Sequence, residues 1–107
     1  MKIIYNNIIP FPGYKAINLF GVLFVRKGAV MKDEDINHEA IHTTQMKEML
    51  YIFFYLWYII EWVIKLFIHG TYAYRNISFE REAYQNEDNL EYLDNRKHYS
   101  WTKYLKQ

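Results

Sequence analysis

The chain of 107 residues contains no cysteine, and this absence excludes two kinds of site. Without thiols there are neither disulfide bonds nor thiolate ligands, so a metal site in this chain must use His, Asp, Glu and water. An excess of one charge is also lacking, because the formal net charge is only +1. Domains that bind nucleic acid are more often strongly basic, so we expect no nucleic-acid partner.

A long apolar run near the start of the sequence is absent as well. The apolar stretch after Lys2 is interrupted by Asn6 and Asn7, and then by Pro10 and Pro12. A secretory signal peptide needs an unbroken apolar core of about 7–15 residues. We therefore expect a cytoplasmic protein.

Aromatic residues, in contrast, are abundant at 20% of the sequence, and many of them fall in residues 49–68. About 20 apolar residues can span a bilayer, but the fully uncharged part of this run, Met49–Ile60, has the shorter length typical of a buried helix. Glu61 and Lys65 are four residues apart and can pair on one helix face. We interpret residues 49–68 as a core helix, with membrane association or a homo-oligomer interface as the alternatives.

The first half of the sequence predicts strands followed by helices. Residues 1–30 form the strand region, because Ala16–Val25 is rich in β-branched and aromatic residues and Gly21 offers either a hairpin turn or a bulge within one strand. Residues 33–69 have helical periodicity, with no glycine or proline after Ile36, and we expect any break in this helix to lie near Glu61.

The second half predicts a loop over residues 71–77 and an acidic helix over residues 78–94. Ser78 is a favourable N-cap for that helix, and residues 95–107 form a polar, basic tail. Together these elements predict an α+β fold in a single domain, 1–107.

One motif carries chemistry, the HExxH sequence from His38 to His42. Two imidazoles at positions i and i+4 of a helix lie on one face and can bind the same zinc ion. Glu39 projects beside that face, where it can accept a proton from zinc-bound water. The spacing predicts His38 and His42 as metal ligands and Glu39 as the catalytic base.

A zinc site of this kind needs a third protein ligand. Glu48 is close in sequence to His42, but a continuous helix would carry it about 15 Å along the axis from His38, so we reject it. His69 and His98 are isolated histidines near a helix end and in the tail, and such residues are more often surface groups than ligands. The acidic helix supplies the better candidates.

Two glutamates of that helix compete for the role. The apolar residues of this helix, Phe79, Ala83, Leu90 and Leu93, share one stripe. Glu82 lies roughly 60–65° from the centre of that stripe, whereas Glu80 lies roughly 95° away, so helix geometry favours Glu82. If Glu82 is the third ligand, Asn86, four residues later, would be the side chain that supports the metal site. Both glutamates also suit the first turn of a helix without any metal.

The segment from Glu80 to Tyr84, taken with the HExxH motif, resembles the gluzincins, zinc metallopeptidases whose third ligand is a glutamate from a later helix. In membrane-bound members that helix often has the pattern Glu-x-x-small-Asp, which this segment follows except that Tyr84 replaces the Asp. The resemblance implies Glu80 as the third ligand. It also implies a zincin-like fold, with short strands or a hairpin packed on a long HExxH helix, a second apolar helix and the glutamate helix.

Two functions follow from this resemblance. The first is a zinc-dependent metallopeptidase that acts on a peptide or protein, with His38, His42 and Glu80, or alternatively Glu82, holding zinc. The second is a non-catalytic zincin-like module that acts through a partner or a membrane surface. Gluzincins are usually larger than 107 residues and have a further subdomain below the cleft, and its absence here supports the second function.

Overall fold

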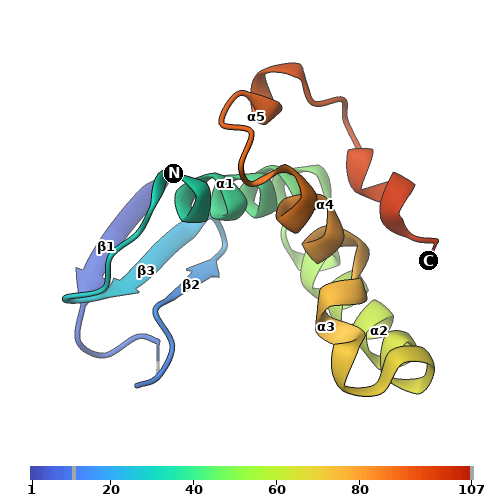
Figure 1. The fold of residues 1–107 in the computed structure, drawn as a ribbon, viewed down its shortest axis with the longest axis horizontal. Helices are drawn as coiled ribbons and strands as arrows, with labels where there is room; N and C mark the ends of the chain where they lie inside the picture. Colours follow the sequence, from blue (N-terminus) through green and yellow to red (C-terminus); the bar gives the residue numbers. More distant parts are fainter. Residues whose placement is uncertain (11, 107) are drawn as a thin grey trace.

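The computed structural model describes residues 1–10 and 12–106, which form a three-stranded sheet beside a group of helices (Figure 1). The expected α+β class is confirmed. In chain order the elements are the strands β1 (Lys2–Asn6), β2 (Ala16–Leu19) and β3 (Val22–Arg26), and the helices α1 (Asp33–Glu48), α2 (Ile52–His69), α3 (Ala73–Asn76), α4 (Ser78–Asn86) and α5 (Tyr92–Asn95), with short 3-10 segments at Gly70–Tyr72 and Ser100–Tyr104.

The sheet has the order β1-β3-β2, so β2 is an edge strand. Of the two alternatives at Gly21, the structure has the hairpin: β2 and β3 are antiparallel, and Phe20 and Gly21 between them both have positive φ angles, 53° and 88°. Such a pair matches the twist of the two strands, and glycine adopts this conformation without steric cost. Asn18 of β2 donates to the Glu39 carbonyl at 3.0 Å, which fastens the edge strand to α1.

The helical region 33–69 is interrupted between α1 and α2, and not near Glu61 as the sequence suggested. Leu50 and Tyr51 have positive φ angles, and the Tyr51 N–H donates to the Met46 carbonyl at 2.8 Å. This bond from the second residue past the cap is the closing bond of a Schellman motif, with Leu50 at the position where glycine is usual. The chain then reverses, so that Phe54 of α2 packs in one cluster with Met46 of α1.

The second half of the chain departs from the expectations in two ways. Residues 71–77 are not a loop, because Gly70–Tyr72 and α3 form consecutive helical turns that run alongside α2 (Figure 1). The glutamate helix is shorter than the expected 78–94, since α4 ends at Asn86 and a turn separates it from α5.

The beginning of α4 is held by a carboxylate from another helix. Ser78 is the first residue of α4 and not its N-cap. Its backbone N–H and its hydroxyl both donate to the Glu61 carboxylate of α2, each at 2.6 Å. Tertiary structure therefore supplies the acceptor that we expected from the serine itself, and the negative charge suits the positive end of the helix dipole. The predicted pair is also present, with Lys65 Nζ 3.7 Å from the same carboxylate.

The expectation that residues 49–68 form a core helix is wrong. In α2 only Phe54, Glu61 and Lys65 are buried, and the other apolar side chains of the helix are half-buried or exposed. The helical segment that begins with α2 is long and apolar enough to cross a membrane, a property that it shares with core helices of soluble proteins.

Glu61→Gln tests the role of the buried carboxylate. We expect the free energy of unfolding to fall by about 3 kcal/mol, because Lys65 stays buried without its counter-charge and the first turn of α4 loses a charged acceptor. Urea unfolding followed by circular dichroism gives this value. Glu34→Gln, on the exposed face of α1, is the matched control. A loss below about 1 kcal/mol for Glu61→Gln would show that the ion pair does not organise α4.

Candidate metal centre

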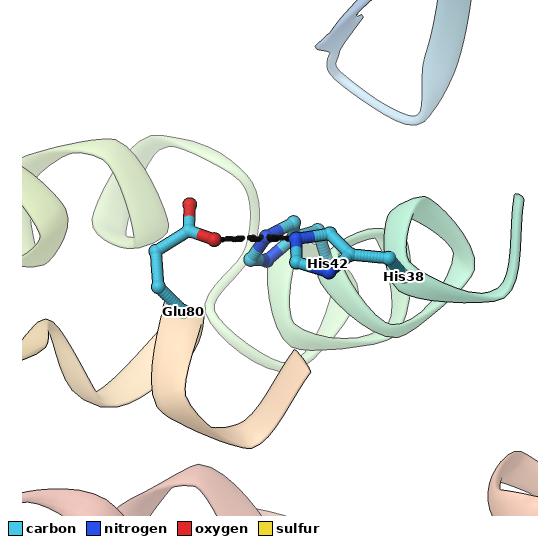
Figure 2. Close-up of side chains that lie close together, drawn as sticks. All are labelled: His38, His42 and Glu80. Carbon is cyan, nitrogen blue, oxygen red and sulfur yellow. Dashed lines mark hydrogen bonds and ion pairs between the residues drawn. The ribbon is translucent and has the colours of Figure 1, made fainter. Parts of the chain in front are cut away.

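The two histidines of the HExxH motif lie one turn apart on α1 and both face α4 (Figure 2). They are buried, with 8% and 6% of their surfaces exposed, and their Nε2 atoms are 3.2 Å apart. The helical spacing i, i+4 brings the rings together, with centroids 4.8 Å apart.

Glu80 of α4 completes a three-residue group. Its Oε1 lies 3.2 Å from Nε2 of His38 and 3.0 Å from Nε2 of His42 (Figure 2). These three atoms could hold one metal ion. Ligands at zinc distances of about 2.0–2.1 Å in a tetrahedron lie about 3.3 Å from one another, so the separations fit a metal site.

Each of the three side chains has a second partner that fixes its orientation. Nδ1 of His38 is 2.8 Å from a carboxylate oxygen of Glu87, and Nδ1 of His42 is 2.8 Å from Oε1 of Gln45. Tyr58 of α2 donates its hydroxyl to Oε2 of Glu80 at 2.7 Å. Partners of this kind hold metal-binding imidazoles in one tautomer and one orientation.

These partners determine where the imidazole protons lie. The Glu87 carboxylate can only accept, and the Gln45 amide nitrogen already donates to the Phe79 carbonyl, so its oxygen faces His42. Both Nδ1 atoms therefore donate. In neutral rings the two Nε2 lone pairs then point at the Glu80 carboxylate, and three acceptors facing one another require a cation or a proton between them.

The electrostatics of the group follow from this arrangement. Burial alone would lower the pKa of His42, but the adjacent Glu80 carboxylate outweighs it and raises that pKa to about 9. Burial works against ionisation of Glu80, yet the histidines and the Tyr58 hydroxyl hold the pKa of this carboxyl well below its usual range. A proton on His42 thus occupies the position between the ligands that a metal ion would otherwise take.

A pocket of about 270 Å³ adjoins the group and contains Glu39. The residues Ala16–Leu19 of the edge strand form one wall, and tyrosines of α2 and α3 form another. Burial raises the pKa of Glu39, which the nearby histidines only partly offset. The predicted base therefore lines the same pocket as His42 and Glu80.

The alternative third ligand, Glu82, lies elsewhere. Two residues along a helix correspond to a rotation of about 200°, so Glu82 points away from the histidines. Its carboxylate accepts from Arg96 Nε and from the Tyr92 hydroxyl, each at 2.6 Å. Asn86, the proposed support for the Glu82 side chain, donates instead to the backbone carbonyl of Glu82 at 2.8 Å. The position of Glu82 near the apolar stripe correctly indicated that it is buried, but its buried carboxylate pairs with Arg96 and not with a metal ligand set.

The other candidates are also outside the group. Glu48 binds Arg96 through two nitrogens at 2.9 and 3.0 Å, and the largely exposed His98 lies 3.3 Å from the same carboxylate. His69 ends α2 and is not among the grouped residues. Sequence reasoning missed the supporting residues Gln45, Glu87 and Tyr58. Of these only Gln45 could have been predicted from the sequence, because it is three residues after His42 and therefore on the same helix face.

Arg96 links this support to the C-terminal part of the chain. It binds both Glu82 and Glu48, and Glu82 in turn accepts from the amide of Gln45 at 2.9 Å. The orientation of the Gln45 oxygen toward His42 thus depends on a chain of contacts that begins beyond α5. Residues after α4 therefore help to position the candidate metal ligands.

The comparisons with known proteins identify no relative. No family model matches the sequence, and neither the curated proteins nor the solved structures contain a significant match. The geometry of the site is therefore the basis for the functional inference.

Glu87→Gln tests the support of His38. Because the amide no longer accepts as a charged group, we expect metal affinity to fall by about 10–100-fold. Competition with a chromophoric chelator measures the dissociation constant. Asp88→Asn removes the same charge from the exposed next residue and is the matched control. Equal affinities for the two variants would contradict the assigned contact.

The raised pKa of His42 makes the metal-free protein sensitive to pH. Since this pKa is above its unfolded value of 6.5, the stabilisation is fully present below pH 6.5 and disappears as the pH rises through about 9. We expect chelated protein to lose up to about 3 kcal/mol over this range. Metal-loaded protein should lose much less, because the ion replaces the proton. Unfolding curves from pH 6 to pH 10, with and without chelator, compare the two; parallel curves would contradict this assignment.

Proposed function

We propose that this protein is a zinc-dependent hydrolase of the metallopeptidase type. The observation that carries the proposal is the convergence of three acceptor atoms, from His38, His42 and Glu80, beside a pocket that also contains Glu39. Two imidazoles and one carboxylate are a ligand set found in catalytic zinc sites, where three protein ligands leave a position for water or substrate.

The chemistry divides between the ion and the residues of the chain. Bound zinc would lower the pKa of a water ligand toward neutrality and polarise a carbonyl group. Glu39 would accept the proton of the attacking water, and its raised pKa brings it closer to the range in which a base works at neutral pH. Tyr74 lines the same pocket, and burial together with the nearby Glu80 carboxylate raises the pKa of its phenol, so it would be a hydrogen-bond donor for a developing oxyanion.

A peptide is the substrate class that this pocket favours. The edge strand β2 forms one wall, and its side away from β3 carries backbone groups that no strand pairs within the described residues. An extended peptide can add to such an edge through main-chain hydrogen bonds. This arrangement would present a peptide carbonyl to Glu39 and the metal ligands.

A structural metal is the second candidate function. The three ligands come from α1 and α4, and all are buried, so a bound ion would tie the two helices together. Structural metal sites contribute directly to folding free energy. This alternative predicts a stabilising metal and no cleavage by the wild type.

Glu39→Gln tests the proposed base. We expect the variant to retain one zinc per chain and to lose activity on a fluorogenic peptide library by about 10²–10⁴-fold, because it can no longer accept a proton. Elemental mass spectrometry on protein purified without a metal-affinity tag measures the zinc.

Matched variants distinguish the ligands in the same measurement. His38→Ala and Glu80→Ala should lose the zinc, whereas Glu82→Ala should retain it wherever the protein remains folded. Cleavage by Glu39→Gln at the wild-type rate would refute the assigned role. A zinc-loaded wild type that cleaves nothing, yet loses thermal stability on chelation, would favour the structural metal.

A further inference from the structure

The helix α2 directs its charged residues toward the protein and its apolar residues outward, the reverse of a helix in an ordinary soluble domain. Its two charged residues, Glu61 and Lys65, are 6% and 5% exposed and pair with each other against the protein. Apolar side chains cover the outward side, and the exposed fraction reaches 90% at Phe67. Single exposed apolar residues are common, but a continuous face of this kind indicates an interaction surface.

The outward face is broad and free of charge. On a helix with about 100° per residue, the exposed apolar residues from Leu66 round to Trp57 span an outward arc of about 180°, and Trp62 lies just beyond Leu66, past the half-buried Tyr55. The exposed residues in that arc are Ile52, Phe53, Leu56, Ile59, Ile60, Val63, Ile64, Leu66 and Phe67. None of them carries a polar group. We call this surface the α2 apolar face.

The breadth of the face favours lipid as its occupant. One helix of a second copy packs along a narrow seam and would leave much of an arc of about 180° in water. Hydrocarbon chains cover an arc of any width. The two tryptophans at its margins also suit the boundary between hydrocarbon and head groups, where an indole ring is favoured.

The neighbouring elements indicate how the helix lies in the membrane. The helix α3 returns alongside α2 (Figure 1), and the first residues of α4 contact α2, with the rings of Phe79 and Phe54 4.5 Å apart. Arg75 of α3 is exposed, and Arg81 of α4 is partly exposed. If α2 crossed the bilayer, these guanidinium groups would enter the hydrocarbon region with it, at a cost of several kcal/mol each. A helix that lies in the plane of one leaflet avoids this cost.

Basic side chains are exposed in the C-terminal part of the chain. The segment Ser100–Tyr104 packs mainly on α4 and reaches α2 through Trp101, whose ring lies 5.4 Å from the ring of Trp57. Lys97, Lys103 and Lys106 of this part of the chain are exposed. Lysines near the surface add attraction to anionic head groups.

From these observations we propose that α2 lies in the plane of a membrane, with its apolar face buried in one leaflet that contains anionic lipid. Tyr58, on the opposite side of α2, contacts Glu80. The candidate metal centre would then lie about one helix diameter, roughly 10 Å, from the lipid. The proposal does not depend on the hydrolase function, because the metal ligands take no part in it.

Flotation with vesicles tests the binding. The full chain is produced by cell-free synthesis with vesicles of phosphatidylcholine containing about a quarter phosphatidylglycerol. Wild type should float with the lipid, and Ile60→Glu should reduce the bound fraction about tenfold, because the carboxylate would enter the leaflet. Leu90→Glu is the matched control, since Leu90 is 56% exposed and Ile60 is 58% exposed. Leu90→Glu should float as wild type does.

Three outcomes would overturn the proposal. The first is wild type that does not float. The second is equal flotation of Ile60→Glu and wild type, and the third is a soluble wild-type dimer that Ile60→Glu dissociates, which would assign the face to a second copy. Circular dichroism of each variant shows whether it has folded.

The in-plane arrangement has its own test, because the chain has no cysteine of its own. Phe53, Ile60 and Phe67 are seven residues apart and project within about 40° of one another from the outward face. Each is replaced by cysteine and labelled with an environment-sensitive fluorophore. Quenching by lipids brominated at different depths should give similar depths for all three labels. A deep label at Ile60 between two shallow labels would show a spanning helix and refute the in-plane arrangement.

Discussion

The buried Glu80 carboxylate is the group on which the candidate site depends. A carboxylate so deeply buried is unfavourable unless charged or polar partners surround it. Here two imidazoles approach one oxygen and the Tyr58 hydroxyl approaches the other. This requirement holds α1, α2 and α4 in one arrangement. It also leaves a site where a proton or a metal ion must balance three converging acceptors.

Other buried charges stabilise the same arrangement of helices. The Glu61 carboxylate accepts from the first residue of α4, and Arg96 joins Glu82 of α4 to Glu48 at the end of α1. A chain of this length has a small apolar core, which here centres on Phe54 and Phe79. Hydrogen-bonded ion pairs therefore contribute much of what positions the helices. If one partner of such a pair moves away, the other is left charged, buried and unpaired. The pairs therefore restrict the helices to one packing arrangement more strictly than apolar contacts do.

The same distribution accounts for the unusual surface of the molecule. The charged groups of α2 are directed inward. Within the described residues, its apolar side chains therefore pack against the rest of the protein only in a narrow strip around Phe54. The hydrophobic effect then acts between the protein and its surroundings as well as within the core. The proposed lipid contact and the polar interior are two consequences of a single helix orientation.

Local patterns predicted several features because they depend on neighbouring residues. The spacing of His38 and His42 places both rings on one face, the spacing of Glu61 and Lys65 allows their pair, and Gly21 permits the hairpin turn. Other features depended on distant groups. The chain reverses at Leu50 although no glycine marks the site, and Ser78 failed as a cap because Glu61 supplies the acceptor.

The sequence by itself determined the two imidazoles, the neighbouring carboxylate of Glu39 and the α+β order of elements, since each follows from helical or strand periodicity. Only the tertiary structure decided between Glu80 and Glu82, because both lie in the same short helix and differ in the direction they face. It also brought Tyr58 of α2 and Glu87, which follows α4, to the ligands on α1 and α4. Contacts between segments far apart in the chain depend on how the helices pack, and no local pattern encodes that packing.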